Sequence, residues 1–208
     1  MRKERVVFDL DGVLLDSESD LSWLDRAFRK ALKEFGVEPT EDNLKKLYPG
    51  EVENLEEGVK NFPATPAEVW DTRDRYYVSE KLEMIEAGEL RPFPDVQYLG
   101  DLKGKYQLGI ISNSPSEVVG SFLEKYELRE LFRAWVGRAT GLEGLRRIKP
   151  HPRPFQELKR EMGAGPYTYV GDRESDRKFA ERTGMDFLHL TRDDCGFANL
   201  KEVVEYLL

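Results

Sequence analysis

The hydrophobic residues of this chain fall into short apolar runs and into longer stretches where apolar positions recur at helical spacing. Five runs have the length and composition of buried strands, and they are Val6–Leu10, Gln107–Ser112, Ala134–Gly137, Thr168–Gly171 and Phe187–Leu190. Helical spacing marks four further segments, which are Ser116–Tyr126, Pro154–Met162, Asp176–Thr183 and Asn199–Leu208. Because strands and helices alternate, the pattern predicts an α/β fold with a doubly wound, parallel sheet.

Residues 17–89 interrupt this alternation, because no convincing strand lies within them. Their first helix is predicted from an apolar stripe that ends before Gly36. The members of that stripe are Leu21, Leu24, Phe28, Ala31, Leu32 and Phe35. Pro39 and Pro66 mark two later helix starts, the second of them ahead of a segment rich in aromatic residues. The pattern therefore predicts a wholly helical insertion.

Together the two patterns predict two domains. Residues 1–16 and 90–208 would form the α/β core, and residues 17–89 would form a small helical subdomain inserted after the first strand. Connectors near Leu14–Glu18 and Ala87–Pro94 would act as hinges between them. In a doubly wound sheet the ligand binds at the carboxyl ends of strands, near the point where strand order reverses. The candidate site is therefore expected at that edge of the core.

Two carboxylates follow the first strand, one residue apart. Asp9 and Asp11 lie on the same side of an extended chain because side chains alternate with period two, and Gly12 then permits a sharp turn. Acids at this spacing repel each other, so they lower stability unless a cation or a function compensates. The alternative is an ordinary hairpin over Val6–Leu15 with solvated acids, because Asp-Gly between apolar runs is a common hairpin signal.

Polar and cationic side chains stand at two further places. Ser112 and Asn113 lie between a strand end and a helix start, where a hydroxyl and free backbone N–H groups suit a phosphate. A helix cap made by Ser114 or Ser116 would explain the same segment. Lys149 lies in a segment stiffened by prolines, and its compact ammonium suits a phosphoryl oxygen or crowded carboxylates. The alternative is a solvated lysine in a stiff loop.

A later apolar run ends in Gly171 and Asp172, and Asp176 follows one helical turn further on. The two carboxylates would face the same point, and carboxylate oxygens are the hard ligands that Mg²⁺ prefers. Capping of a helix N-terminus by acids is the alternative. Taken in order along the chain, the polar stretches predict a magnesium-dependent phosphoryl-transfer site on one edge of the sheet.

Composition narrows the classes of partner. The formal net charge is −8 and the isoelectric point is near 5.1, with no basic stripe, so a nucleic-acid partner is not expected. A single cysteine, Cys195, excludes a disulfide within the chain. No apolar stretch approaches the length that spans a membrane, and Met1–Arg5 leads directly into the first strand without a signal-peptide pattern. We expect a cytoplasmic protein without a membrane partner.

The four polar stretches, in this order, resemble the motifs of the haloacid dehalogenase superfamily in its phosphatase branch. The matching segments are Asp9-Leu10-Asp11-Gly12-Val13, Ser112-Asn113, Lys149-Pro150, and Gly171-Asp172 with Asp176. Residues Arg91–Val96 and Lys149–Pro152 also resemble the phosphoglycolate-phosphatase-like and sugar-phosphatase-like members. The resemblance implies a Rossmann-like core with a helical cap that closes over the site and shapes the choice of substrate.

The resemblance also implies a role for each site residue. Asp9 would attack phosphorus and form an aspartyl-phosphate, and Asp11 would act as general acid and then as general base. Ser112 and the backbone N–H of Asn113 would hold phosphoryl oxygens. Lys149 would offset the negative charge of the acids and of the substrate.

Mg²⁺ is the cofactor that the resemblance implies. Its ligands would be the Asp9 carboxylate, the Asp11 backbone carbonyl and Asp172, and the ion would neutralise charge on the phosphoryl group. Asp176 would stand behind these ligands, where it would hold a metal-bound water or orient Lys149.

Three positions depart from the pattern of the relatives. Arg173 stands where relatives often carry a small hydroxyl residue, and it would contact a substrate or partner or remain solvated. Ser175 stands where relatives often have an asparagine. Glu174, which lies between these two residues, would replace or assist Asp176 at the metal. Leu21 occupies the position of a histidine found in many sugar-phosphate relatives, which weakens an assignment as an intramolecular phosphosugar mutase.

The leading interpretation is a Mg²⁺-dependent phosphatase that acts on a small phosphorylated metabolite, as a monomer or a homodimer. A phosphosugar mutase on the same core is the nearest alternative. A dehalogenase is disfavoured because Asp11 is present, and a phosphonate hydrolase would need a Schiff-base lysine in the cap that nothing in the sequence identifies. A non-catalytic binding or regulatory module on the same fold is the alternative from another class.

Overall fold

The computed structural model describes residues 4–192 and 195–208, and the chain divides into two compact units. The first unit runs to Glu18 and takes in Leu90–Arg138 and the residues from Arg147 onward. The second comprises Ser19–Glu89 together with Ala139–Arg146. The domain boundaries drawn from the sequence stay a prediction, but no pattern in the sequence indicated that residues 139–146 pack with the second unit.

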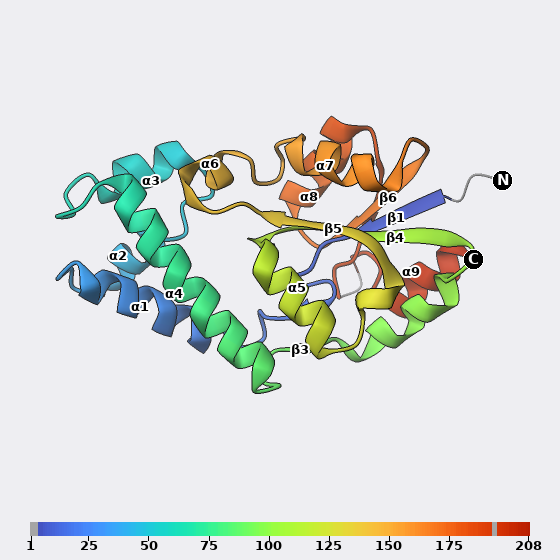
Figure 1. The fold of residues 1–208 in the computed structure, drawn as a ribbon, viewed down its shortest axis with the longest axis horizontal. Helices are drawn as coiled ribbons and strands as arrows, with labels where there is room; N and C mark the ends of the chain where they lie inside the picture. Colours follow the sequence, from blue (N-terminus) through green and yellow to red (C-terminus); the bar gives the residue numbers. More distant parts are fainter. Residues whose placement is uncertain (1–3, 193–194) are drawn as a thin grey trace. The chain divides into compact units, whose positions relative to one another are not determined.

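A five-stranded parallel sheet forms the centre of the first unit, with the strand order β5-β4-β1-β6-β7 (Figure 1). The strands are β1 (Glu4–Phe8), β4 (Tyr106–Pro115), β5 (Phe132–Arg138), β6 (Tyr167–Gly171) and β7 (Asp186–His189). β1 pairs with both β4 and β6, so that Val7 lies opposite Gly109 and Tyr169. The α/β fold is confirmed. The hairpin over Val6–Leu15 is wrong, because both neighbours of β1 come from distant segments.

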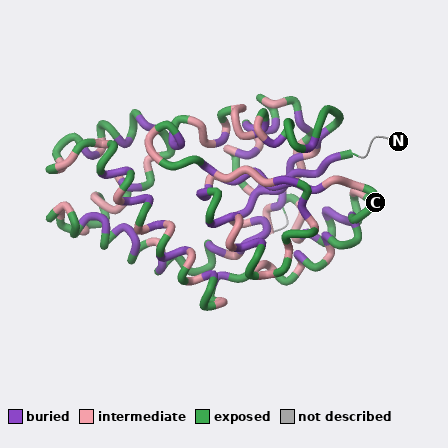
Figure 2. Tube along the Cα trace, in the orientation of Figure 1, coloured by how far each residue is buried: buried purple, intermediate pink, exposed green. Residues whose placement is uncertain are grey.

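Helices pack on both faces of this sheet. They are α5 (Ser116–Lys125), α7 (Arg153–Met162), α8 (Glu174–Thr183) and α9 (Leu200–Leu207). α7 and α8 lie on one face, and α5 and α9 lie on the other (Figure 1). The strands run through the most buried part of the unit (Figure 2). One buried cluster joins β-strand side chains to α7 and α8, and its members are Val7, Ile111, Ala134, Phe155, Leu158, Met162, Tyr167, Tyr169, Phe179, Ala180 and Met185.

Short elements escaped the sequence patterns. β2 (Leu15–Asp16) pairs with β3 (Arg91–Pro92) in an antiparallel ladder, and the Phe93 N–H donates to the Leu14 carbonyl at 3.0 Å. Two residues per strand are too few for an alternating pattern to be recognised. These contacts tie the two expected connectors to each other inside the first unit. The 3₁₀ helices of this unit are η1 (Pro94–Leu102) and η2 (Arg129–Leu131).

The described part of the second unit is helical. Its helices are α1 (Ser22–Glu34), α2 (Glu41–Lys46), α3 (Val52–Val59), α4 (Pro66–Glu86) and α6 (Gly141–Arg146). α4 begins at a capping box, in which Thr65 Oγ1 accepts from the Glu68 N–H at 3.3 Å and the Glu68 carboxylate accepts from the Thr65 N–H at 2.8 Å. The predicted apolar stripe is wrong at Leu21, which is 52% exposed. α1 begins at Ser22, so Leu21 lies before the helix, and Trp23 is the first buried residue of the helix.

Within residues 4–192 and 195–208, none of the helices combines the length and the apolar composition that crossing a membrane requires.

Candidate active site

The predicted site residues lie at the carboxyl ends of three adjacent strands, β4, β1 and β6. Asp9 directly follows β1, Asp172 directly follows β6, and Ser112 and Asn113 lie in the last part of β4. The first turn of α8 adds Asp176. Because parallel strands end at one edge of a sheet, these side chains meet where the strand order reverses around β1.

Lys149 lies between two of the acids, and its side chain is 1% exposed. Its Nζ is 2.8 Å from Asp9 Oδ2 and 2.7 Å from Asp176 Oδ1, and it donates to the Tyr169 hydroxyl at 2.8 Å. The Lys149 backbone N–H donates to Asn113 Oδ1 at 2.8 Å. Burial alone would lower the pKa of this ammonium, but the charges of Asp176 and Asp9 outweigh burial and raise the pKa. The solvated-lysine interpretation is therefore wrong.

Tyr169 was not among the predicted site residues. Its hydroxyl accepts from Lys149 and donates to the Ile111 carbonyl oxygen at 2.9 Å, and its fully buried ring packs edge-on against Phe179. In a strand sequence a tyrosine indicates packing, which is why its polar role was missed. One feature of the sequence could have identified Tyr169. It is a tyrosine at a buried position of a strand that ends in the site, and a buried hydroxyl requires a hydrogen-bond partner.

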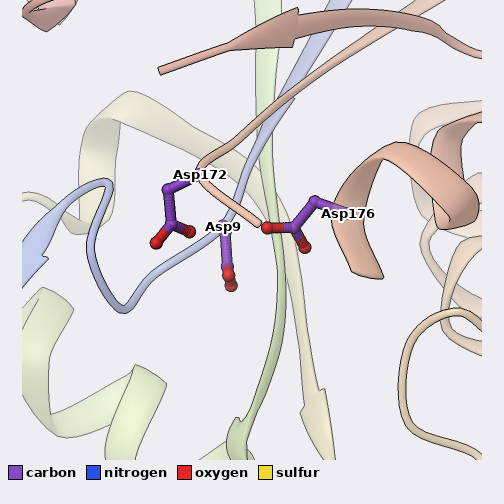
Figure 3. A group of neighbouring side chains, drawn as sticks. All are labelled: Asp9, Asp172 and Asp176. Carbon is purple, nitrogen blue, oxygen red and sulfur yellow. The ribbon is translucent and has the colours of Figure 1, made fainter. Parts of the chain in front are cut away.

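Asp9, Asp172 and Asp176 form a group whose ligand atoms all lie within 4.8 Å of one another (Figure 3). Asp172 Oδ1 is buried and has no hydrogen-bond partner in the described part of the chain. Burial, with the negative charges of Asp9 and Asp176, raises the pKa of Asp172 to about 8. Burial also raises the pKa of Asp9 to about 6, against the opposing charge of Lys149. Crowded hard oxygen donors with an orphaned acceptor fit a divalent cation such as Mg²⁺.

Two glycines permit the close approach of these acids to the backbone. A Cβ atom at Gly12, which adopts φ +78°, would lie 2.5 Å from Asp172 Oδ2. A Cβ atom at Gly171 would lie 2.5 Å from the Cβ of Asp176. A larger residue at either position would displace a carboxylate, so each glycine is required by an acid that another part of the chain contributes.

The carboxylate of Asp11 lies outside this group. It accepts from Ser17 Oγ at 2.5 Å and from Ser114 Oγ at 2.6 Å. Ser112 Oγ in turn accepts from the Ser114 N–H at 3.0 Å. The helix-cap interpretation of Ser114 or Ser116 is wrong, because the N-cap residue of α5 is Pro115, which makes no side-chain cap hydrogen bond, and the Ser114 hydroxyl donates to Asp11. The role of Asp11 as general acid and base stays a prediction.

Comparison with known proteins assigns the chain to a family. The family described as haloacid dehalogenase-like hydrolase matches residues 6–190. The chain belongs to this family. The phosphoglycolate phosphatase of Aquifex aeolicus (strain VF5) is 31% identical over 186 residues, which cover 86% of this chain and 80% of the relative. The family and this relative together show that the protein is a phosphatase.

Solved structures of other proteins confirm the fold. A structure described as a predicted phosphoglycolate phosphatase from Haemophilus somnus 129pt superposes with a TM-score of 0.72 at 23% identity, covering 100% of this chain and 99% of that one. A putative beta-phosphoglucomutase from Thermotoga maritima superposes with a TM-score of 0.62 at 20% identity, covering 98% of each chain. At these identities the likeness shows the fold alone. Because the two structures carry different descriptions and share this fold, the fold does not distinguish between the two activities.

Arg173 and Glu174, the two residues that directly follow Asp172, lie in different surroundings. The Arg173 guanidinium pairs with Glu18, and its Nε lies 3.6 Å from Asp172 Oδ2. Arg173 is therefore not simply a solvated arginine. Glu174 is 65% exposed, pairs with Arg177 at 3.5 Å and lies outside the group of three carboxylates.

Proposed function

We propose that this family member is a Mg²⁺-dependent phosphatase that hydrolyses a small phosphorylated metabolite through an aspartyl-phosphate. The name of the Aquifex relative supports phosphoglycolate as the first substrate to test. One observation carries the proposal: Lys149 is enclosed by Asp9 and Asp176, and Asp172 stands beside them in the same acidic group. Phosphoryl transfer depends mainly on such positioned charge.

The proposed metal ligands are the carboxylates of Asp9 and Asp172 and the backbone carbonyl of Asp11. The raised pKa of Asp172, about 8, and its orphaned oxygen support this choice, because a cation would relieve both the repulsion and the missing contact. When bound, Mg²⁺ supplies neutralising charge to the phosphoryl group.

Asp176 is proposed to orient Lys149 and to leave the direct metal contacts to the other acids. Its Oδ1 contacts Lys149 Nζ at 2.7 Å, and its Oδ2 accepts from the Arg173 N–H at 3.1 Å. Both oxygens therefore already have partners, whereas Asp172 Oδ1 has none in the described part of the chain. The hydrogen bond from the Arg173 N–H also places Asp176 as an acid at the N-terminus of α8, where the helix dipole favours it.

Asp9 is the proposed nucleophile. Its Oδ1 accepts from the Leu10 N–H at 2.7 Å and its Oδ2 contacts Lys149, so the carboxylate is held at both oxygens. With a pKa of about 6 it is mostly ionised at neutral pH, as attack requires. Attack forms a bond between an Asp9 oxygen and phosphorus and breaks the bond from phosphorus to the leaving oxygen, which takes a proton from Asp11. Water then hydrolyses the aspartyl-phosphate after giving a proton back to Asp11.

Phosphate release from a panel of substrates tests the proposal. The panel holds phosphoglycolate, sugar phosphates, nucleotides and p-nitrophenyl phosphate, each with and without Mg²⁺. Asp9→Asn should lower metal-dependent release at least ~1,000-fold. Asp101→Asn, at an exposed aspartate of η1, is the matched control and should leave it unchanged. Trapping of acid-quenched enzyme with hydroxylamine should detect the acyl phosphate in the wild type only.

Release that survives Asp9→Asn, or release without Mg²⁺, would overturn the proposed mechanism. Movement of phosphate between positions of a sugar, with a requirement for a sugar bisphosphate, would identify a mutase instead. Failure to release phosphate from any substrate would favour a binding or regulatory role.

A further inference from the structure

Arg192, which follows β7, contacts the loop that follows the first strand. Its Nε donates to the Gly12 carbonyl oxygen at 3.2 Å, and its Nη2 donates to the Val13 carbonyl oxygen at 2.7 Å. These two carbonyls come directly after Asp11. Because a guanidinium presents its N–H donors in a rigid plane, contacts with two successive carbonyls set both the position and the orientation of this stretch.

The arginine is itself held from several sides. Asp95 Oδ2 lies 2.8 Å from Arg192 Nη1, and the same oxygen accepts from the Leu200 N–H at 2.7 Å at the start of α9. The guanidinium carbon lies 3.4 Å from the centre of the Phe93 ring. The Arg192 backbone has φ +58°, in the left-handed region that residues other than glycine rarely adopt. A residue keeps such a conformation only where its surroundings determine its place strongly.

The other backbone contacts of the loop close it on itself. The Gly12 N–H donates to the Leu15 carbonyl at 3.0 Å, and the Leu14 and Leu15 N–H groups both donate to the Leu10 carbonyl at 2.8 Å. The Asp11 carboxylate accepts from Ser17 at the far end of the same loop. The same carboxylate also accepts from Ser114 of β4, outside the loop. A shift of the loop would therefore move the Asp11 backbone and change the geometry of both hydrogen bonds, whereas Asp9 lies before the loop, at the end of β1.

We propose that Arg192 is a positioning residue that keeps Asp11 aligned with Asp9 for proton transfer. The proposal rests on the proposed function, which gives Asp11 its acid role. It has a chemical consequence that a purely structural role lacks. Loss of Arg192 should slow substrates whose leaving group needs a proton, such as alkyl phosphates, more than aryl phosphates, whose leaving group departs without one.

The test compares Arg192→Met and Arg192→Lys with Arg182→Met, at an exposed arginine of α8. Initial rates are measured on the best alkyl phosphate of the panel and on p-nitrophenyl phosphate. Arg192→Met should lower kcat on the alkyl phosphate about tenfold and on p-nitrophenyl phosphate less than about threefold. Arg192→Lys should recover only part of the loss, because an ammonium can pair with Asp95 but cannot reach two carbonyls in one plane. Arg182→Met should change neither rate. Asp11→Asn shows how much more the alkyl phosphate than p-nitrophenyl phosphate is slowed when the proposed acid is lost, and the ratio for Arg192→Met is compared with that value.

Equal losses on the two substrates, or no loss on either, would overturn the proposal. A second measurement does not depend on turnover. Hydrogen–deuterium exchange of peptides covering residues 10–17 should be faster in Arg192→Met than in the wild type and unchanged in Arg182→Met, and unchanged exchange in Arg192→Met would also overturn the proposal. A wild type that releases no phosphate would defeat the proposed function, whereas the exchange result would still decide whether Arg192 holds the loop.

Discussion

The two carboxylates beside Lys149 and the carboxylate of Asp172 belong to one acidic group, but their charges are balanced differently. Asp9 and Asp176 contact the ammonium at 2.8 and 2.7 Å, whereas Asp172 keeps a buried oxygen without a partner in the described chain. Burial raises the pKa of Asp172 to about 8 but that of Asp9 only to about 6, because Lys149 offsets part of the cost at Asp9. Lys149 therefore balances Asp9 and Asp176 directly, whereas the nearest ion pair of Asp172 among the described residues is the longer contact with Arg173, at 3.6 Å.

Removal of the lysine should have the largest effect on this balance. Lys149→Met leaves two buried carboxylates facing each other, so we expect it to lower the free energy of unfolding by about 3–5 kcal/mol near pH 8 and to abolish phosphate release. The loss should shrink at about pH 5, where the carboxylates take up protons. Chemical denaturation at the two pH values measures the loss of stability, and a phosphate-release assay measures the loss of activity. Lys178→Met, at an exposed lysine of α8, is the control. A loss that does not vary with pH would contradict the pairing.

Removal of the Asp172 charge should stabilise the metal-free protein, in contrast to removal of Lys149. Asp172→Asn should raise the free energy of unfolding by about 1–2 kcal/mol at about pH 9, because it removes a partly buried carboxylate whose pKa is raised to about 8 in the folded protein. The same change should eliminate phosphate release and the stabilisation by Mg²⁺. Asp186→Asn, at an exposed aspartate of β7, is the control. A less stable Asp172→Asn protein would mean that this acid is already satisfied without a metal.

The pH dependence of stability should distinguish the contribution of Asp9 from that of Asp172. The pKa values of Asp9 and Asp172 in the folded protein lie above the ordinary value of 3.8, at about 6 and about 8. Their contribution to stability is therefore present at acid pH and is lost as the pH rises, first through the pKa of Asp9 and then through that of Asp172. A bound cation removes this loss. Mg²⁺ should raise the Tm by several degrees more at about pH 8.5 than at about pH 6, and EDTA should reverse the gain. Equal shifts at both pH values would argue against Asp172 as a ligand.

The smallest effect is expected from the hydroxyl that supports Lys149. Tyr169→Phe and Tyr167→Phe each remove one hydroxyl from β6, and the Tyr167 hydroxyl donates to the Gly163 carbonyl at 2.6 Å, away from Lys149. Each change should lower the free energy of unfolding by about 1 kcal/mol. Only Tyr169→Phe should also lower kcat, by about fivefold, since of the two hydroxyls only that of Tyr169 contacts Lys149, the lysine proposed to act in catalysis. Parallel steady-state kinetics and thermal melts measure this, and equal kcat values would remove Tyr169 from the site.

Much of the site could be predicted because its signals are local. A buried run that ends in a polar residue identifies a strand end, and Asp9 and Asp172 directly follow β1 and β6. The same signal stopped short in β4, because the strand predicted to end at Ser112 continues to Pro115. The parallel sheet then brings strand ends to one edge whatever the intervening segments are. The same local signals predicted α5 and α7 within a few residues of their ends.

The unpredicted parts depend on meetings between distant segments. Nothing near Tyr169 indicates that its hydroxyl meets Lys149, and nothing near Ser114 indicates that it binds Asp11. The segment 139–146 shows the same limit at a larger scale, because its packing with the second unit depends on residues far away in the sequence.

The sequence by itself determined the α/β class, the approximate positions of the strands and the chemical types of the site residues, because hydrophobic period and polar termination act over a few neighbouring residues. Only the tertiary structure decided how the charges are shared. It enclosed Lys149 between Asp9 and Asp176 and, within the described residues, left Oδ1 of Asp172 without a partner. Coulombic and hydrogen-bond energies depend on distances of a few ångströms and on the exclusion of water, and both are established only when distant segments pack together.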